Sequence, residues 1–391
     1  MSAANDWLYL DYAATTPVDR EVAATLSALL TEDADFANPS AVHIAGRRAG
    51  VHVERAAAQL AALVNCRPDR LIWTSGATES NNLAIIGAAR YRSDRGRHLV
   101  TMPTEHKAVT DVYRALERQG FDVTWIKPGS DGVLDPADFE AALREDTQLA
   151  SIMHVNNETG VIQDIDAIGA ICRARGILFH VDAAQSLGKL PIDLDTQPID
   201  LLSASAHKIY GPAGIGLLYL ADRPGCHVEA LTYGGAQQRG LRPGTLPVPL
   251  IAAFGKAAEI AAARMDEDYR HLRRLRDSLW AGIRDVAGLH RNGSETRSFP
   301  GILNVGIDDI EGESLLLALE PLCVATGSAC NSRDREPSYV LRALGLSDAL
   351  AQSAVRFSFG RTTRPADIDF AAARYRDAVA RLRQLAPVRA A

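Results

Sequence analysis

The sequence has no uncharged apolar stretch approaching about 18 residues, so no segment is expected to span a membrane. Residues 1–10 lack a basic region followed by a long apolar run, which argues against a signal peptide. Positive charge is also scarce, because 42 Lys and Arg stand against 48 Asp and Glu, for a net charge of −6. Without a strong positive field, direct binding to DNA or RNA is not expected.

Cysteine is sparse and irregularly placed. The five cysteines are an odd number at wide spacings, which fits neither a disulfide framework nor a zinc knuckle, and no metal site is predicted. The simplest interpretation is a protein of the reducing cytoplasm. One reactive thiol among several unreactive ones is compatible with this pattern. The cysteines are Cys66, Cys172, Cys226, Cys323 and Cys330.

The length and the pattern of apolar residues favour a two-domain α/β protein. A chain of 391 residues is too long for one small core. Between residues 71 and 220, short apolar runs alternate with helical patterns such as 138–143 and 165–175, which predicts a largely parallel sheet covered on both faces. In such sheets the functional groups collect at the carboxyl ends of the strands. The expected strands are residues 71–74, 98–101, 123–126, 149–154, 178–182, 201–205 and 215–220.

Helical patterns flank this block on both sides. Before it, residues 18–29 and 53–64 each place apolar side chains on one helical face. After it, a helical run over residues 250–285 leads into a second α/β segment, with strands near 301–305 and 354–359 and helices near 312–320 and 366–385. The predicted division is an N-terminal segment that packs with the small domain (1–15), a large domain (16–260) and a small C-terminal domain (261–391).

Two motifs at strand ends indicate a site for a carbonyl cofactor. Lys208, in Ser-Ala-His-Lys after residues 201–205, is placed to form a Schiff base, although a lone lysine is more often a solvated surface residue. Asp182 follows an apolar run, and a buried carboxylate needs a partner such as a protonated pyridine nitrogen. A helix N-cap is an equally good interpretation of this aspartate.

A third motif, Ser-Gly-Ala-Thr-Glu-Ser-Asn at residues 75–81, follows a strand and opens a helical pattern. Backbone N–H groups at a helix N-terminus, with hydroxyls beside them, bind phosphate, and a plain capping box is the alternative. The chain contains neither G-x-x-x-x-G-K-[ST] nor a G-x-G-x-x-G that opens the sheet, which argues against nucleoside triphosphate binding and against a nicotinamide dehydrogenase.

Three further residues carry weaker signals. His106, after the strand at 98–101, could stack on a cofactor ring and move protons, but a lone histidine is more often structural. Asn156 and Asn157 lie in an amide-rich loop that suits either a ligand or a turn.

One cysteine stands in an unusual setting. Small and polar residues surround Cys330 in Ala-Thr-Gly-Ser-Ala-Cys-Asn-Ser, and charged residues follow, so the segment is expected to be an exposed, mobile loop. A thiol on such a loop can reach into a site and then out to a partner. Cys323 is expected to be a buried strand residue, and the other three cysteines are expected to be structural.

A lysine after a strand, an aspartate at a strand end and a hydroxyl-rich helix start together describe a pyridoxal phosphate (PLP) site. On these residues the chain resembles the cysteine desulfurases of the NifS/IscS type, in the class V aminotransferase group, and most of all the IscS branch. The resemblance implies the α/β PLP-dependent transferase fold type I, with a seven-stranded mostly parallel sheet in the large domain and a smaller α/β C-terminal domain. The matching segments are residues 10–17, 74–82, 104–109, 151–160, 180–194, 205–216, 240–247, 326–332, 337–346 and 355–361.

The resemblance implies a role for each candidate residue. Lys208 would bind PLP covalently, Asp182 would pair with the pyridine nitrogen, and Gln185 would hydrogen-bond the phenolic oxygen. His106 would stack on the ring and shuttle protons. The phosphate would be held by the Ala77 backbone, Thr78, Ser205 and His207, and by Thr245 of the neighbouring subunit of a homodimer.

The same resemblance implies the substrate site and the reaction. Asn157, beside the cofactor, and Arg356 would bind the carboxylate of L-cysteine, Arg356 through a bidentate fork. Lys208 would remove the Cα proton, and the Cys330 thiolate would attack the substrate sulfur, leaving L-alanine and a persulfide that passes to an acceptor protein. Iron–sulfur cluster assembly, tRNA thiolation and DNA phosphorothioation are open destinations. A selenocysteine lyase or a PLP aminotransferase is the alternative, but an aminotransferase has no need of the thiol.

The chain departs from the family pattern in three places. Ala206 replaces the glycine usual before the His-Lys pair, a small change expected to be tolerated. Residues 221–228 lack the several arginines with which IscS enzymes dock partners, and the sequence after Leu385 lacks the longer tail offered to the iron–sulfur scaffold. These departures put the usual partners in question and leave the desulfurase chemistry in place.

Overall fold

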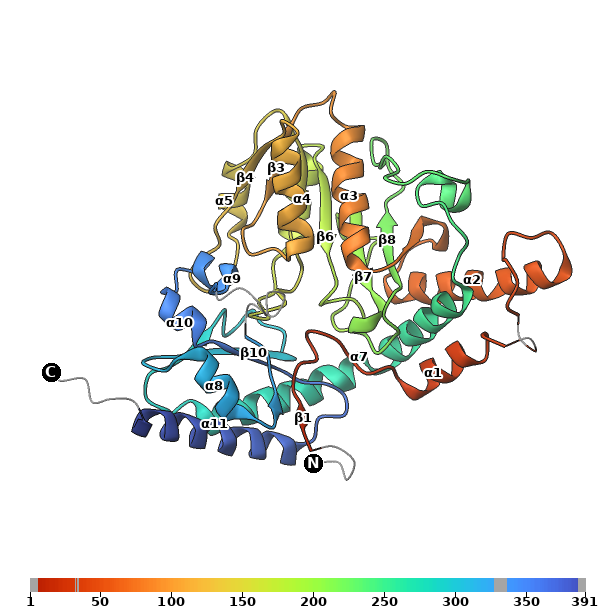
Figure 1. The fold of residues 1–391 in the computed structure, drawn as a ribbon. Coiled ribbons are helices and arrows are strands. Elements are labelled where there is room, and N and C mark those ends of the chain that lie inside the picture. Colours follow the sequence, from red (N-terminus) through yellow and green to blue (C-terminus); the bar gives the residue numbers. More distant parts are fainter. Residues whose placement is uncertain (1–5, 32, 34, 327–335, 386–391) are drawn as a thin grey trace.

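A seven-stranded sheet forms the centre of the computed structural model, which describes residues 6–31, 33, 35–326 and 336–385 (Figure 1). The strand order is β2-β8-β7-β6-β5-β3-β4; β8 runs antiparallel to both of its neighbours, and the other neighbouring pairs are parallel. This confirms the predicted mostly parallel sheet. The strands are β2 (Leu71–Thr74), β3 (His98–Thr101), β4 (Asp122–Trp125), β5 (Thr147–Ser151), β6 (Leu178–Asp182), β7 (Leu201–Ser205) and β8 (Gly216–Leu220).

Both faces of the sheet are apolar, since successive side chains of a strand point to opposite faces. The paired residues Leu149 and Leu178 belong to the core under α3 and α4, whereas Ala150 and Phe179 belong to the core on the other face. That second core also holds residues of α1, α2, α5, α6 and the first part of α7. The helices are α1 (Arg20–Ser27), α2 (Ile44–Leu63), α3 (Ala77–Tyr91), α4 (Lys107–Arg118), α5 (Pro136–Ala141), α6 (Ile165–Ala174) and α7 (Val248–Ile283).

A separate apolar core lies at the C-terminal end of α7, around the antiparallel sheet β12-β10-β9 (Figure 1). The long helix α7 joins this core to the sheet core that contains Phe179, because Ala261 packs in the sheet core and Leu272 packs in the C-terminal core. The N-terminal β1 pairs in parallel with β11, and Leu10 lies in the C-terminal core. The remaining elements are β1 (Leu8–Tyr9), β9 (Leu289–Asn292), β10 (Ile302–Ile307), β11 (Leu322–Cys323), β12 (Val355–Ser358), α8 (Gly312–Leu319), α9 (Tyr339–Ala343), α10 (Asp348–Gln352), α11 (Pro365–Leu385) and the 3₁₀ turns η1 (Pro68–Arg70), η2 (Ala206–Lys208) and η3 (Gln237–Gly240).

The structure corrects the sequence-based expectations at several points. The strand predicted over residues 149–154 is wrong at both ends, because β5 spans Thr147–Ser151. The predicted end was too late because Ile152 and Met153 are buried beyond the strand and extend the apolar run. Cys323 lies in a strand as expected but is only partly buried. The division of the chain at residues 15 and 260 stays a prediction. None of the helices described is long and apolar enough to cross a bilayer.

Candidate active site

The carboxyl ends of β2, β6 and β7 meet at one edge of the sheet, where a cavity of about 540 Å³ opens. Residues at the strand ends, in the N-terminal segment and in β12 line it. Thr245 does not line it, and Cys330 lies outside the described residues. The candidate residues that the cavity brings together are Ala77, Thr78, His106, Asn157, Asp182, Gln185, Ser205, His207, Lys208 and Arg356.

Lys208 ends the 3₁₀ turn η2 directly after β7, which places its amine at the sheet edge. Its Nζ donates to the carbonyl oxygens of Ala13 and Ala14, at 2.6 and 2.8 Å. The neighbouring His207 ring contacts the Thr15 hydroxyl at 3.1 Å. The N-terminal segment therefore meets the lysine turn and closes one side of the cavity.

Asp182 is the last residue of β6 and is 4% exposed. Its Oδ2 accepts a hydrogen bond from Asn81 Nδ2 at 2.7 Å, and its Oδ1 accepts from the Ala184 N–H at 2.9 Å. The buried carboxylate is thus oriented by α3 and by its own turn. Sequence analysis quoted Asn81 within a motif but gave it no role. The signal was available, because Asn81 lies four residues after Ala77 on the same helical face.

Two glycines allow the start of α3 to approach the sheet closely. Gly76, the N-cap, has a φ of 154°, in the region that favours glycine. A Cβ at Gly216 of β8 would lie 2.6 Å from Gly76 Cα. The N–H groups of Ala77 and Thr78 lie in the first turn of α3, where a helix leaves its donors free for an anion.

His106 caps α4, and its Nδ1 accepts the Ala108 N–H at 3.1 Å. Because a backbone N–H can only donate, the neutral ring carries its proton on Nε2. Burial lowers the pKa of His106, and the nearby Lys208 lowers it further, while Asp182 opposes the shift. The imidazole is therefore neutral near pH 7 and able to accept or pass a proton.

Arg356 in β12 is 3% exposed and heavily committed on two of its nitrogens. One Nη donates to the Asn157 carbonyl at 2.8 Å, and the other forms an ion pair with Asp11 at 2.6 Å. The third nitrogen, Nε, has no partner among the described groups, and neither has Asn157 Oδ1. The guanidinium is thus held in place, and its Nε–H stays available to a ligand.

Glu158 is a buried carboxyl that lines the cavity together with Arg356. No role was predicted for it from the sequence. Its Oε2 accepts the Ser338 hydroxyl at 2.5 Å, and Ser338 caps α9 through the Leu341 N–H. Burial raises the pKa of Glu158 to about 7, although Ser338 and Arg356 act in the opposite direction. Nothing local in the sequence signalled this residue, because its partner lies 180 positions away.

The described chain on both sides of Cys330 reaches the cavity. Before it, Ala325 exchanges backbone hydrogen bonds with Arg356 at 2.7 and 3.2 Å. After it, residues 336–339 line the cavity wall. The segment between these anchors therefore starts and ends beside the candidate substrate site.

The four described cysteines sit in settings that disfavour thiolates. Burial raises the pKa of Cys66 and of Cys226 to about 12 and the pKa of Cys172 further. Burial, followed by the charge of Asp11, also raises the pKa of Cys323. Since the thiolate is the reactive form, none of these four is suited to nucleophilic attack near neutral pH.

The cavity fits the expected cofactor and substrate. Three residues of its lining have a buried polar atom with no partner among the described groups, namely Asn81 Oδ1, Asn157 Oδ1 and Arg356 Nε. Unsatisfied buried groups are rare in folded proteins, so their convergence on one cavity indicates a polar ligand. An amine, a buried carboxylate and a helix N-terminus match the carbonyl, pyridine nitrogen and phosphate of PLP.

Comparison with known proteins agrees with this chemistry. The family model described as aminotransferase class-V matches residues 8–370. The cysteine desulfurase IscS of Serratia proteamaculans is 53% identical over 382 residues, which cover 97% of this chain and 95% of that protein. The cysteine desulfurase IscS of Klebsiella pneumoniae is 52% identical with the same coverage.

Solved structures show the same relationship. A NifS-like protein superposes with a TM-score of 0.89 at 33% identity, covering 96% of this chain and 100% of that one. DndA from Streptomyces lividans gives a TM-score of 0.78 at 41% identity, covering 90% of this chain and 99% of that one. The chain therefore belongs to the class V aminotransferase family and, within it, to the PLP-dependent cysteine desulfurases of the IscS type.

Proposed function

We propose that this chain takes the sulfur of L-cysteine onto Cys330 and releases L-alanine. The observation that supports this most strongly is a single cavity lined by Lys208, Asp182 and Arg356. The described chain on both sides of Cys330 reaches this cavity, because Ala325 pairs with Arg356 and residues 336–339 line the wall. In the overall reaction the Cβ–S bond breaks, a Cβ–H bond forms, and the sulfur joins the thiol as a persulfide.

The residues at the sheet edge would hold PLP. Lys208 would bind its carbonyl carbon, Asp182 its pyridine nitrogen and Gln185 its phenolic oxygen. When bound, PLP supplies an electron sink for the bond broken at Cα. The phosphate would be held by the Ala77 backbone, Thr78, Ser205 and His207, all of which line the cavity.

The substrate carboxylate would bind at Arg356 in the same cavity. Arg356 has a free Nε, and its two other nitrogens are fixed by Asn157 and Asp11. A guanidinium fixed in this way loses little rotational freedom on binding. Asn157 would contribute its side-chain amide beside the cofactor.

Two side chains are suited to proton transfer at the reacting carbons. Lys208, once released from the cofactor, would take the Cα proton, and neutral His106 would pass protons near the ring. The hydrogen bond from Ala108 fixes which ring nitrogen of His106 carries its proton. The N-terminal segment that holds Lys208 also covers one side of the cavity, which restricts the access of water.

Cys330 is within reach of the substrate site by chain length. It lies five residues after Ala325, which is paired to Arg356, and five extended residues span at most about 18 Å. A thiol on this tether can therefore meet the substrate sulfur. Delivery outward requires an acceptor protein, for iron–sulfur cluster assembly, tRNA thiolation or DNA phosphorothioation. Direct nucleic-acid binding is not part of the proposal.

The active unit is proposed to be a homodimer with shared sites. Several large apolar side chains are exposed on one protomer, in the loop before α2, in α2 itself and in the loop after β8. Thr245 is exposed and lies away from its own cavity, as a residue that serves the partner's phosphate would be. The exposed apolar residues include Phe36 (66%), Val42 (88%), Ile44 (65%) and Tyr233 (87%).

The proposal is tested by following L-cysteine turnover in the PLP-loaded protein. Wild type should release L-alanine and, with a thiol reductant, sulfide. The Cys330→Ser variant should keep the cofactor absorbance and lose sulfide release, and its wild-type counterpart should gain the mass of one sulfur on Cys330. Cys323→Ser is the matched control and should turn over normally. A keto-acid product, or loss of activity in Cys323→Ser alone, would contradict the assignment.

A further inference from the structure

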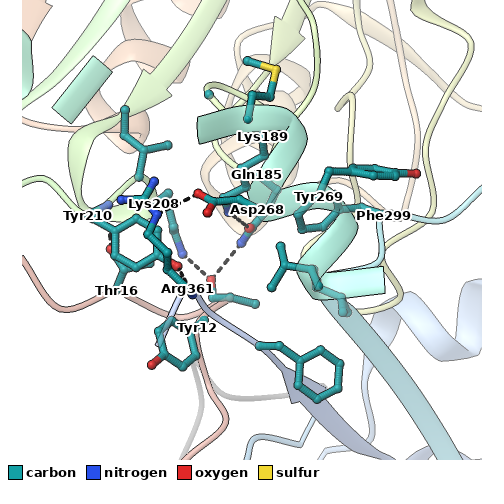
Figure 2. A pocket seen from close by; sticks show the side chains of 18 residues that line it. Tyr12, Thr16, Gln185, Lys189, Lys208, Tyr210, Asp268, Tyr269, Phe299 and Arg361 are labelled. Carbon is teal, nitrogen blue, oxygen red and sulfur yellow. Dashed lines mark hydrogen bonds and ion pairs between the residues drawn. The ribbon is translucent and has the colours of Figure 1, made fainter. Parts of the chain in front are cut away.

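A second, smaller cavity of about 40 Å³ lies beside the first, and Figure 2 shows the side chains that line it. Ala13, Gln185 and Lys208 line both cavities, so these residues form the wall between them. The far side of this wall carries a lysine, Lys189, that plays no part in the reaction described so far.

Lys189 is partly buried and approaches the wall from the turn after β6. Its Nζ donates to Gln185 Oε1 at 3.0 Å and lies 5.7 Å from the centre of the Phe299 ring. Among the described residues, no carboxylate lies within ion-pair distance of this ammonium. A cation in such a setting destabilises the protein unless neighbouring groups pair with it or accept its hydrogen bonds.

The other charged groups around Lys189 leave its charge uncompensated. Asp268, the acidic residue of this cavity, is paired with Arg361 at 2.7 Å and with Arg264 at 3.5 Å. The nearest cation is Lys208, and burial, followed by that charge, lowers the pKa of Lys189 to about 7. The titratable and charged groups that face it are Tyr12, His207, Lys208, Tyr210, Asp268, Tyr269 and Arg361.

Lys189 fixes the orientation of the Gln185 amide. Lys189 Nζ donates to the amide oxygen, so Nε2 points the other way. Nε2 donates to the Ala13 carbonyl at 2.8 Å, and the same carbonyl accepts from Lys208 Nζ. A continuous set of hydrogen bonds therefore links Lys189 to Lys208 (Figure 2).

The electrostatic interaction between the two lysines acts in both directions. If the charge of Lys208 disfavours a proton on Lys189, the charge of Lys189 equally disfavours a proton on Lys208 Nζ. The nitrogen of Lys208 has to give up its proton before it can act as a base or bind a carbonyl. A second, partly buried cation, linked to Lys208 through Gln185 and the Ala13 carbonyl, favours that state.

We propose that Lys189 is a positioning residue, which presents the Gln185 N–H to the cofactor's ring oxygen and favours the unprotonated nitrogen of Lys208. The inference rests on the proposed function, since both effects concern a PLP held by Lys208 and Gln185. Lys189 lies behind the site and does not line the larger cavity. Replacing Lys189 should therefore change the spectrum and the affinity of the cofactor, while every residue that touches the cofactor stays in place.

The first measurement is a pH titration of the absorbance of the bound cofactor, without cysteine. In Lys189→Met the midpoint should rise by on the order of one pH unit, because one nearby positive charge is removed. Lys189→Arg keeps the charge and should titrate near the wild-type pH. Lys127→Met, at an exposed loop position, is the control and should not move the midpoint. An unchanged midpoint in Lys189→Met, or equal shifts in the Met and Arg variants, would overturn the charge effect.

The second measurement compares the affinity of the apoprotein for PLP and for 3-deoxypyridoxal phosphate, which lacks the ring hydroxyl. Wild type should prefer PLP, and Lys189→Met should lose about tenfold of that preference, the value of one hydrogen bond. Lys189→Gln keeps a donor for Gln185 and should retain the preference while shifting the pH midpoint. Equal losses for both ligands would mean a general structural role and overturn the inference. A wild-type protein that binds neither ligand would instead contradict the proposed function.

Discussion

At the scale of single residues, the hydrogen bond between Glu158 and Ser338 joins the loop that contains Asn157 to the start of α9, which follows Cys330 in the chain. Glu158 precedes a glycine turn beside Asn157, and Ser338 begins α9 directly after the wall residues 336 and 337. The hydrogen bond between them is buried, so salt in the solvent screens it little. Proton uptake by this carboxyl should therefore affect the stability of the folded protein.

The first prediction concerns pH. The pKa of Glu158 is raised from 4.5 to about 7 in the folded state, so the folded state holds the proton more tightly than the unfolded chain does. The resulting stabilisation is complete below pH 4.5 and is lost as the pH rises through about 7, by roughly 3 kcal/mol. Glu158→Gln should remove this dependence. Urea unfolding of the apoprotein at several pH values between 5 and 7 measures it.

The control for this series is Glu229→Gln, an exposed carboxyl of the loop after β8. Its unfolding curves should follow those of wild type at every pH. If the Glu158→Gln and wild-type stabilities fall in parallel as the pH rises, the buried carboxyl does not titrate in this range.

Single residues also mark where sequence reasoning stops. Lys208 and Asp182 could be found because each follows an apolar strand directly, and the carboxyl edge of a parallel sheet is where ligands bind. Lys189 and Glu158 could not be found in this way. Each is defined by a partner that packing brings near, Phe299 for the one and Ser338 for the other, and no local pattern announces such a contact.

At the scale of secondary-structure elements, the junction of β2, α3 and β8 lies at the proposed phosphate site. Gly216 pairs with Thr74 and Ser205, and a Cβ there would lie 2.5 Å from the Ala204 oxygen and 2.6 Å from Gly76 Cα. These neighbours are backbone atoms of two elements, so they cannot rotate away. The absence of a side chain at Gly216 sets how closely α3 approaches the sheet.

The second prediction is that Gly216→Ala forces α3 away from β8. Overpacking against backbone costs about 1–3 kcal/mol in the free energy of unfolding, and the displaced N–H groups should weaken PLP binding at least tenfold. Gly50→Ala in α2 is the matched control, since its nearest neighbour is 3.6 Å away and alanine favours a helix. Equilibrium dialysis of PLP and denaturant unfolding check both. Full cofactor affinity in Gly216→Ala would refute the tight junction.

Elements with strong local signals were predicted well from the sequence. The expected strands at residues 71–74, 98–101, 178–182 and 201–205 agree with the structure at both ends. The short strands β1 and β9 were not predicted. A two-residue strand such as β1 has no period of its own, and only its pairing with β11 defines it.

At the scale of the whole molecule, residues 221–228 differ from the arginine-rich stretch expected of an IscS enzyme. Residues 221–228 contain one arginine, Arg223, and it is bound to the buried Asp200 through two nitrogens. Arg223 also donates to the Ile177 carbonyl at 3.3 Å. A guanidinium committed in this way stabilises the protomer and offers little to a partner.

The third prediction is weak binding to an iron–sulfur scaffold from an IscS system. Losing exposed arginines mainly slows electrostatically guided association, so calorimetry should show an affinity on the order of tenfold below that of the cognate enzyme. Introducing arginines at the exposed Pro224 and His227 should recover part of the loss, most clearly at low salt. An affinity equal to that of the cognate enzyme would show that this stretch is dispensable.

The last prediction tests whether two protomers share each site. Lys208→Ala destroys the site in its own cavity, whereas Thr245→Asp should repel the phosphate bound by the partner. In a mixed dimer of these variants, a shared arrangement gives one site with both defects and one with neither. That second site should bind PLP covalently, so borohydride reduction should fix about half an equivalent per chain, against almost none in either parent. If each protomer used its own Thr245, mixing would restore nothing, since every site would keep one defect.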